Sequence, residues 1–196
     1  MKRLFDLLSS GLVLLVSAPL WIVISLAIVF DSKGGVFYQQ IRVGRHNHDF
    51  GLYKFRTMVP NADRKGQLTV GGRDPRITRV GFWLRKYKLD EMPQLLNILK
   101  GEMSVVGPRP EVRKYVDLYS PEQLEVLAVR PGLTDFASLE YLDENELLGK
   151  ASDPEQLYIQ TIMPAKLQLN LRYIKEQGLS TDLRIIFTTL GRIFGR

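Results

Sequence analysis

Cysteine is absent from this 196-residue chain, and histidine occurs only twice, at His46 and His48. Without cysteine, neither a disulfide framework nor a thiolate metal site can form. Both histidines fall in one polar turn, which we expect to be solvated, so a multi-histidine metal site is disfavoured. A phosphate-binding glycine loop, a dinucleotide fingerprint and a Ser-His-Asp set are also missing. These absences leave carboxylates and basic side chains as the groups able to carry chemistry.

The charge of the chain is unevenly distributed. The formal net charge is +6, but residues 1–88 hold 15 Lys and Arg against 5 Asp and Glu, whereas residues 89–196 hold 12 against 16. A basic first half joined to an apolar N-terminus indicates an anionic partner, either lipid headgroups or phosphates. The length suits one domain with a real core.

An uncharged segment of 24 residues lies between Asp6 and Asp31. It is long enough to cross a bilayer core about 30 Å thick, which needs about 20 residues. A cleaved signal peptide is disfavoured because the apolar run is too long and Pro19 directly follows the small residue Ala18. The segment is therefore predicted to be a membrane anchor.

Two topologies remain open for this anchor, a spanning helix and a re-entrant hairpin. Pro19 lies near the middle, where it removes a backbone donor, frees the Leu15 carbonyl and kinks a helix; the Ser17 hydroxyl is placed to compensate. Basic residues also occur on both flanks, so the positive-inside rule favours a cytoplasmic location for both ends. We therefore favour the hairpin, with its break at Ser17, Ala18 and Pro19.

The remaining pattern predicts an α+β, helix-rich single domain. Short extended stretches are expected at residues 36–38 and 50–55 around a turn at 44–47, and a Gly-rich polar loop at 61–76. The clearest helix is expected to begin at Asp90 as N-cap, with Pro93 in its first turn, and to end at Gly101. Further helices are predicted over 121–129 and 154–177. We divide the chain into a membrane anchor, 1–32, and a catalytic domain, 33–196.

Two segments have the composition of interfacial amphipathic helices. Residues 77–88 interleave aromatic with basic side chains, which suits either a membrane interface or an ordinary partly buried helix. A C-terminal stripe flanked by arginines could rest on anionic lipid or equally close the core; its members are Leu183, Ile186, Phe187, Leu190 and Phe194.

The strongest candidate site is the pair Asp90-Glu91. Acidic residues at a helix start often serve only as caps. Here, however, six basic residues precede the pair and Arg109 follows between two prolines, whose restricted backbones would hold its guanidinium in a fixed direction for phosphate. A carboxylate in this place could bind Mg²⁺ or attack phosphorus.

Several motifs together resemble the bacterial sugar transferase family, the monotopic phosphoglycosyl transferases that start glycan assembly on a polyprenyl phosphate. The resemblance covers about residues 1–134, in order. Its blocks are Tyr53-Lys54-Phe55-Arg56-Thr57-Met58, Leu84-Arg85, Leu89-Asp90-Glu91-Met92-Pro93-Gln94-Leu95, residues 97–104, Gly107-Pro108-Arg109-Pro110 and Arg130-Pro131-Gly132-Leu133-Thr134.

The resemblance implies a Mg²⁺-dependent ping-pong transfer of a sugar 1-phosphate from a UDP-sugar to undecaprenyl phosphate, with release of UMP. Asp90 would be the nucleophile, and Glu91 a metal partner or acid/base, the two together forming the metal site. Arg85 and Arg109 would clamp phosphate, and Lys54 and Arg56 would bind the donor's phosphates or uridine. The implied place is the cytoplasmic face of a bacterial inner membrane. The expected pathway is O-antigen, capsule, exopolysaccharide or glycoprotein assembly, and a homo-oligomer is left open.

The chain departs from the family pattern in two places. Ala18 replaces the usual Ser before Pro19, and residues 135–139 replace a Gly- and Gln-containing stretch, so the sugar stays open. Two rivals remain: a membrane-tethered module that binds anionic lipid without catalysis, and a metal-dependent lipid phosphatase. Nucleic acid is disfavoured as a partner, because the basic residues adjoin an apolar segment.

Overall fold

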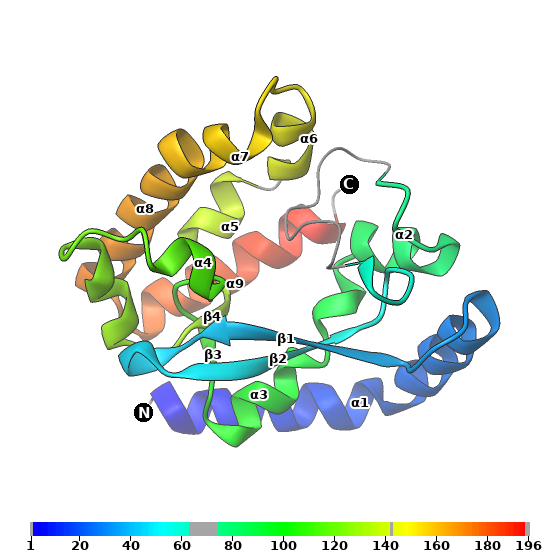
Figure 1. Cartoon of the computed structure of the whole chain (residues 1–196). Coiled ribbons are helices and arrows are strands. Elements are labelled where there is room, and N and C mark those ends of the chain that lie inside the picture. Colours follow the sequence, from blue (N-terminus) through cyan, green and yellow to red (C-terminus); the bar gives the residue numbers. More distant parts are fainter. Residues whose placement is uncertain (1, 63–73, 142, 195–196) are drawn as a thin grey trace.

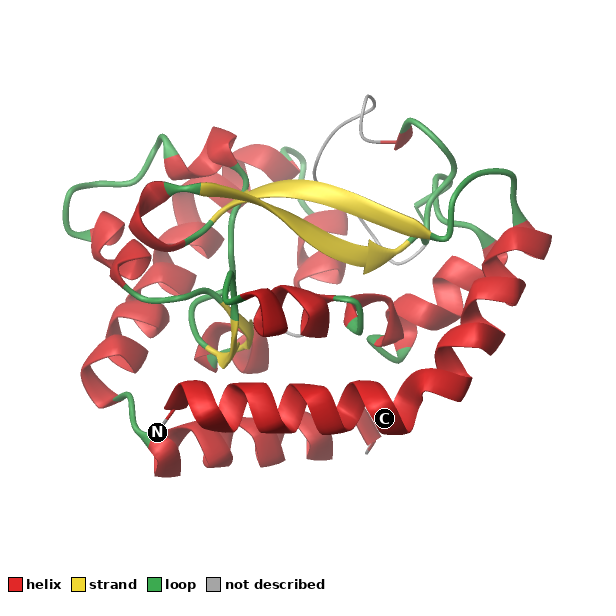
Figure 2. Cartoon of the chain, turned by 90° about the horizontal axis from the view of Figure 1, so that it is seen from below, coloured by secondary structure: helices red, strands yellow, loops and turns green. Residues whose placement is uncertain are grey.

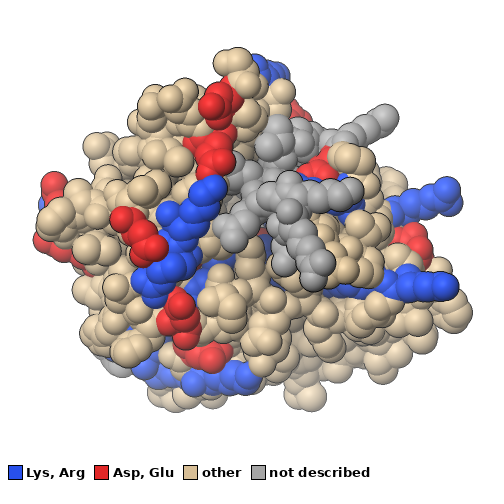
Figure 3. Space-filling model, viewed as in Figure 1, with Lys and Arg blue, Asp and Glu red and all other residues tan. Residues whose placement is uncertain are grey.

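The structure is a computed structural model that describes residues 2–62, 74–141 and 143–194; most of the polar loop predicted at 61–76 lies outside these residues. Helices surround two small two-stranded sheets, and the N-terminal helix runs along one side of the molecule (Figure 1). The prediction of a helix-rich chain with a few short strands is confirmed. On the face drawn in Figure 3, basic and acidic side chains are interspersed.

The first sheet is an antiparallel hairpin of β1, Phe37–Val43, and β2, Asp49–Phe55. Its register pairs Phe37 with Phe55 and Val43 with Asp49. The strands are joined by the short helix η1, Arg45–Asn47, and both histidines beside or within it are exposed, as expected. The predicted extended stretches are thus confirmed, and β1 is longer than the sequence suggested.

The second sheet pairs β3, Ser104–Val106, in parallel with β4, Gly132–Thr134. The two backbone segments approach so closely that a Cβ on Gly132 would lie 2.1 Å from the Gly107 nitrogen. Only glycine fits such a contact between backbones. This contact fixes the start of the Gly-Pro-Arg-Pro loop against the Arg-Pro-Gly segment.

Helix α3, Gln94–Lys100, covers the free edge of β2. The buried Asn97 side chain accepts a hydrogen bond from the Tyr53 N–H at 3.0 Å and donates to the Gly51 carbonyl at 2.8 Å. It also donates to Glu102 at 2.7 Å. One amide therefore satisfies an edge that would otherwise lack backbone partners.

The helix start predicted at Asp90 is wrong. The N-cap of α3 is Pro93, and Asp90 lies in a separate 3-10 turn, η3, Leu89–Glu91. Proline lacks an N–H and has a fixed φ, so it suits the first position of a helix and starts α3 later than the carboxylates suggested. The predicted end is confirmed, because Gly101 caps α3 with φ 89°.

Helix α1, Lys2–Asp31, contains Pro19 within one 30-residue helix. Figures 1 and 2 show that the helix bends, its last turns leaving the direction of the first. It is long and apolar enough to cross a membrane and exposes most of its apolar side chains, the most exposed being Leu15, Val16 and Phe30. The hydroxyl of Ser17 lies 3.5 Å from the Leu14 carbonyl.

Both ends of α1 are bonded to the rest of the molecule. Near its start, Asp6 is buried and accepts hydrogen bonds from the Ser104 hydroxyl and the Val105 N–H. At its end, Asp31 accepts a hydrogen bond from the Val80 N–H at 2.9 Å. Val80 belongs to α2, Arg79–Lys86, the helix predicted within residues 77–88.

The second half of the chain forms a helical subdomain. Its elements are α4, Arg113–Val116, η4, Gln123–Ala128, α5, Phe136–Glu140, α6, Glu144–Gly149, α7, Pro154–Leu157, η5, Tyr158–Ile162, α8, Met163–Glu176, and α9, Leu179–Phe194. The helices predicted at 121–129 and 154–177 are confirmed. The first is a 3-10 helix, and the second is interrupted by the short π-helix η5. Helix α9 buries Ile185 and exposes Phe187 and Leu190.

Candidate active site

Three segments bring charged side chains together at one place. The end of β2 supplies Lys54, the turn η3 supplies Asp90 and Glu91, and the loop after β3 supplies Arg109. The turn follows Lys88, whose φ of 57° lies in the left-handed region and turns the chain sharply after α2.

Glu91 and Arg109 form a two-pronged ion pair. The Arg109 Nη1 donates to Glu91 Oε2 at 3.1 Å, and its Nη2 donates to Glu91 Oε1. Burial works to raise the pKa of Glu91, but the charges of Arg109 and Lys54 outweigh it and hold that pKa well below its usual range. Glu91 is therefore ionised at neutral pH.

Two residues that sequence reasoning missed hold the Arg109 loop. Asp135, fully buried, accepts the Arg109 backbone N–H at 3.1 Å and caps α5 through the Ser138 N–H at 2.6 Å. On the other side, Glu111 accepts a hydrogen bond from Arg42 at 2.8 Å. Asp is a preferred N-cap residue, so a cap at Asp135 was readable from sequence. Its bond to Arg109 was not.

Lys54 lies beside the ion pair, with its Nζ 3.5 Å from Glu91 Oε1. Burial lowers the pKa of Lys54 from 10.5 to about 8, although Glu91 works to raise it. Burial disfavours the charged form of Lys54, and an anionic group bound beside it would stabilise that form.

Asp90 is 6% exposed, and no hydrogen bond or ion pair among the described residues involves its carboxylate. Burial and then the neighbouring Glu91 raise the pKa of Asp90 above its usual value, while Lys54 and Arg85 pull it down. Two adjacent carboxylates therefore have opposite shifts. Glu91 is thus engaged with Arg109, whereas the Asp90 carboxylate makes no hydrogen bond within the described residues.

Arg85 and Arg56 differ in their placement. Arg85 donates through Nε to the Thr57 hydroxyl at 2.9 Å and acts electrostatically on both Asp90 and Glu91, so it belongs to the cluster. Arg56 instead bonds to the Ser32 hydroxyl and carbonyl at 2.6 and 2.8 Å. Its guanidinium therefore ties the end of α1 to β2, and no contact in the described structure joins it to Asp90.

The donor set suits magnesium only in part. No group of three or more His, Asp or Glu side chains among the described residues is arranged to hold a metal. Both Glu91 oxygens accept hydrogen bonds from Arg109, which leaves Asp90 as the available carboxylate. Magnesium is often held by one or two carboxylates with substrate phosphates, so one carboxylate here is compatible with it.

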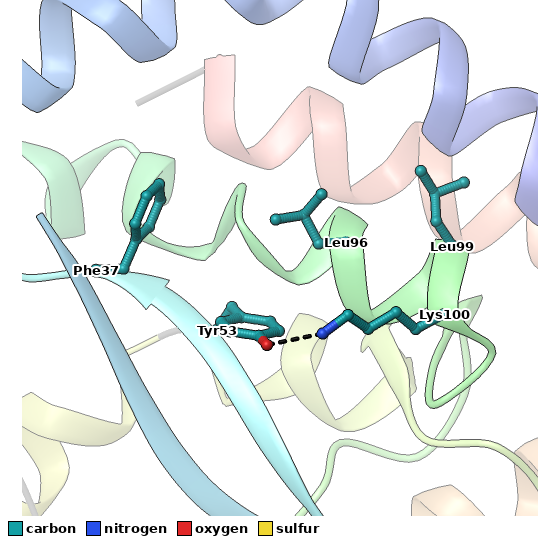
Figure 4. Close-up of a pocket in the computed structure, with 5 residues that line it drawn as sticks. All are labelled: Phe37, Tyr53, Leu96, Leu99 and Lys100. Carbon is teal, nitrogen blue, oxygen red and sulfur yellow. Dashed lines mark hydrogen bonds between the residues drawn. The ribbon is translucent and has the colours of Figure 1, made fainter.

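A separate pocket of about 460 Å³ opens on the face of the β1–β2 hairpin opposite Lys54 (Figure 4). Apolar side chains line most of it, and Lys100 donates a hydrogen bond to the Tyr53 hydroxyl at 2.7 Å. One lining residue, Phe37, contacts Trp21 of α1 with ring centroids 6.1 Å apart. Neighbouring side chains alternate between the faces of a strand, so Tyr53 points away from the Lys54 side.

The cluster brings two carboxylates together with three basic side chains, in a domain fixed to an apolar helix. The chain belongs to the bacterial sugar transferase family, whose model matches residues 1–196. The resemblance read from the motifs is therefore confirmed.

Among similar proteins is the UDP-N-acetylgalactosamine-undecaprenyl-phosphate N-acetylgalactosaminephosphotransferase of Aeromonas hydrophila, 36% identical over 98% of this chain and 43% of its own length. The undecaprenyl-phosphate glucose phosphotransferase of Komagataeibacter xylinus is 38% identical over 100% of this chain and 36% of its own. The exopolysaccharide production protein PSS of Rhizobium leguminosarum bv. phaseoli is 38% identical over 97% of this chain and 93% of its own length. The chain thus spans less than half the length of the first two relatives.

Proposed function

We propose that this protein transfers a sugar 1-phosphate from a UDP-sugar to undecaprenyl phosphate and releases UMP. Two relatives that align with nearly all of this chain carry names that specify undecaprenyl-phosphate sugar phosphotransfer. The observation that carries the proposal is the buried Asp90 carboxylate beside Lys54 and the Glu91–Arg109 pair. The named sugars of the relatives differ, so the donor sugar is left to experiment.

In the first half-reaction, an Asp90 oxygen attacks the sugar-linked phosphorus of the donor. The bond from that phosphorus to the bridging oxygen breaks, and UMP leaves with the electron pair. The product on the enzyme is an acyl phosphate that carries the sugar. Lys54, Arg85 and Arg109 surround the place where negative charge gathers, so they stabilise the phosphoryl group by position and charge.

In the second half-reaction, a phosphate oxygen of undecaprenyl phosphate attacks the same phosphorus. The Asp90–phosphorus bond breaks, which restores the carboxylate and yields the lipid-linked diphosphosugar. Glu91 holds Arg109 in a fixed orientation through its two hydrogen bonds. That orientation matters because a planar guanidinium binds phosphate best through two parallel bonds.

We include Mg²⁺ in the proposal, with Asp90 as its protein ligand and Glu91 as a second only if Arg109 moves. When bound, the ion would neutralise charge on the donor's diphosphate. Its predicted requirement is tested by chelation: excess EDTA should abolish UMP release, and added Mg²⁺ should restore it.

We further propose that α1 is a re-entrant hairpin in a bacterial inner membrane, with the catalytic domain on the cytoplasmic face. Support comes from the bonds that both Asp6 and Asp31 make with the same domain. A straight spanning helix would separate those ends by the thickness of the bilayer. The exposed aromatic side chains of α2, including Trp83, suit the membrane interface.

The decisive experiment is a half-reaction in detergent with a panel of UDP-sugars and no lipid acceptor. With the correct donor, the enzyme should release about one equivalent of UMP and stop, as expected of a ping-pong path. Intact-protein mass spectrometry should show one added phosphosugar, in the peptide that contains Asp90. Undecaprenyl phosphate should then discharge it.

Asp90→Asn is the matched variant, because it keeps the size of the side chain and removes the nucleophilic charge. It should fold normally and form no adduct, whereas Asp117→Asn, on an exposed acid outside the site, should react normally. If UMP appears only with lipid present and no adduct is trapped, the transfer is a direct displacement. Release of inorganic phosphate instead of UMP would indicate a phosphatase.

A further inference from the structure

A second polar cavity, of about 190 Å³, lies at the N-terminal end of α1, away from the catalytic cluster. The first turn of α1, the β1–β2 turn and the segment before β4 all contribute to it. Four of its lining side chains are cations, Lys2, Arg3, Arg45 and Arg130, and one, Asp6, is a carboxylate. A small cavity with this excess of positive charge favours an anion.

The four cations of this cavity outnumber the carboxylates beside them, Asp6 and Asp182. Lys2 forms an ion pair with Asp182 at 2.5 Å. Arg3 bonds to the backbone carbonyls of Ile98 and Leu99, and the Asp6 oxygens are occupied by neutral donors of β3. The ion pairs of the described residues therefore leave three of the four cations without a carboxylate partner.

Arg45 and Arg130 are each fixed by a hydrogen bond from Nε. The Nε of Arg45 donates to the Ala128 carbonyl at 3.0 Å, and the Nε of Arg130 donates to the Gly101 carbonyl at 2.8 Å. In the described structure these are the only hydrogen bonds of either guanidinium. Both Nη groups of each therefore remain available, in the planar geometry that matches a phosphate group.

The position of the cavity indicates where the phosphate group comes from. The residues that follow Lys2 and Arg3 on α1 expose apolar side chains, Leu4 and Leu8 being 62% and 65% exposed. A lipid with its headgroup in the cavity could therefore lay its hydrocarbon chains along α1. Basic pockets beside membrane helices on the cytoplasmic side bind anionic lipid headgroups through their positive charge.

We propose that this cavity binds the phosphate group of an anionic membrane lipid, at a site distinct from the catalytic one. Lys54 lies five residues beyond the start of β2, and thus roughly 17 Å from the turn that carries Arg45. The lining residues do not include any member of the catalytic cluster. Bound lipid would tie the start of α1, the hairpin turn and the segment before β4 together.

The test compares phosphatidylglycerol with phosphatidylcholine, each titrated into the full-length protein in neutral detergent. Phosphatidylglycerol should raise the thermal unfolding midpoint saturably, and phosphatidylcholine should not. Arg45→Gln should weaken the apparent affinity about fivefold, since one cation near an anionic lipid surface contributes about 1 kcal/mol. Arg45→Lys should recover only part of the affinity, because it restores the charge without the planar guanidinium. Lys150→Gln, which removes an exposed charge elsewhere, should keep all of it.

A parallel arm with inorganic phosphate, matched in ionic strength with chloride, separates the two sources of phosphate. If free phosphate stabilises the wild type more than Arg45→Gln while phosphatidylglycerol does not, the lipid assignment is overturned. Equal responses of wild type and Arg45→Gln to every ligand would overturn the site itself. UMP release without added lipid should be the same in Arg45→Gln and wild type; a loss would place Arg45 in the catalytic machinery instead.

Discussion

At the scale of single residues, two adjacent carboxylates of the site differ in their hydrogen-bond partners and in the direction of their pKa shifts. Glu91 is held by Arg109 and Lys54, so it stays ionised and is occupied. Asp90 is buried without a hydrogen-bond partner in the described structure, and burial raises its pKa. In the proposed mechanism, Glu91 fixes Arg109 and Asp90 is the group that reacts.

Arg109→Lys should lower turnover more than tenfold, equivalent to at least about 1.4 kcal/mol. A lysine ammonium is a point charge and cannot reproduce the two parallel bonds that Arg109 makes with Glu91. Steady-state UMP release measures the effect, with thermal unfolding in detergent as the check on folding. Arg113→Lys, at an exposed ion pair outside the site, is the control; near-normal activity of Arg109→Lys would argue against a bidentate role.

The buried Lys54 should give the pH profile a basic limb near pH 8. Its pKa is lowered to about 8 by burial and by Arg109 and Arg42, against the attraction of Glu91 and Asp90. Above that pH the side chain becomes neutral and should stabilise phosphate less well, so UMP release should fall.

Unfolding linked to Lys54 would not explain that fall. The unfolded chain binds more protons than the folded one between pH 8 and 10.5, so the contribution of Lys54 to stability improves across this window. Lys54→Arg, which stays charged, should lose the limb. A limb that persists at the same pH in Lys54→Arg would have to come from another group.

At the scale of elements, α1 is the proposed membrane anchor and also a structural part of the domain. Ile24 and Ile28 pack in one core cluster with Phe55 of β2 and Leu84 of α2. At the other end, Asp6 accepts hydrogen bonds from β3. The apolar surface of α1 is therefore held in a fixed position relative to the domain that carries η3.

Asp6→Ala should destabilise the protein by about 1–3 kcal/mol, because it leaves the buried Ser104 hydroxyl and the Val105 N–H without their acceptor. For a chain of this size the midpoint of thermal unfolding should fall by about 2–4 °C per kcal/mol. Asp117→Ala, at an exposed acid, should leave the midpoint unchanged. An equally small shift in both variants would mean that Asp6 does not hold α1 to β3.

The topology of α1 can be tested with single cysteines, since the native chain has none. Cysteines at Lys2 and Lys33 should both be inaccessible to an impermeant thiol reagent added from the periplasm, if α1 enters and leaves by one face. Labelling at Lys2 from that side would contradict the hairpin. Pro19→Leu should straighten the bent helix and shift part of the population towards spanning.

At the scale of the whole molecule, the apolar surface of α1 and the charged catalytic cluster belong to one folding unit. A chain lacking residues 1–32 would expose Phe55 and Leu84 and leave Ser104 unpaired. Without detergent, we expect this chain to aggregate, as measured by size exclusion. In detergent, we expect it to show no cooperative unfolding transition, as measured by calorimetry. A truncated chain with the midpoint of the full-length protein would show that α1 is only an attachment.

The sequence by itself determined which groups are available and which family they form. The lack of cysteine and the pairing of histidines left Asp90, Glu91 and the basic residues, and the ordered motifs from Tyr53 to Thr134 identified the family. Local patterns also predicted α2, the end of α3 at Gly101 and most of the C-terminal helices, because capping and periodicity depend on near neighbours.

Only the tertiary structure decided how these groups are partnered, since that depends on contacts between distant segments. Asp90 was expected to cap α3 and instead lies in the turn before it, because Pro93 starts the helix. Arg56 and Arg85 have equal charge and similar motif positions, yet Arg56 bonds to the end of α1 and Arg85 acts on the carboxylates. Asp135 was readable from sequence as a helix cap, but its bond to Arg109 depends on a parallel strand pair that no local pattern specifies.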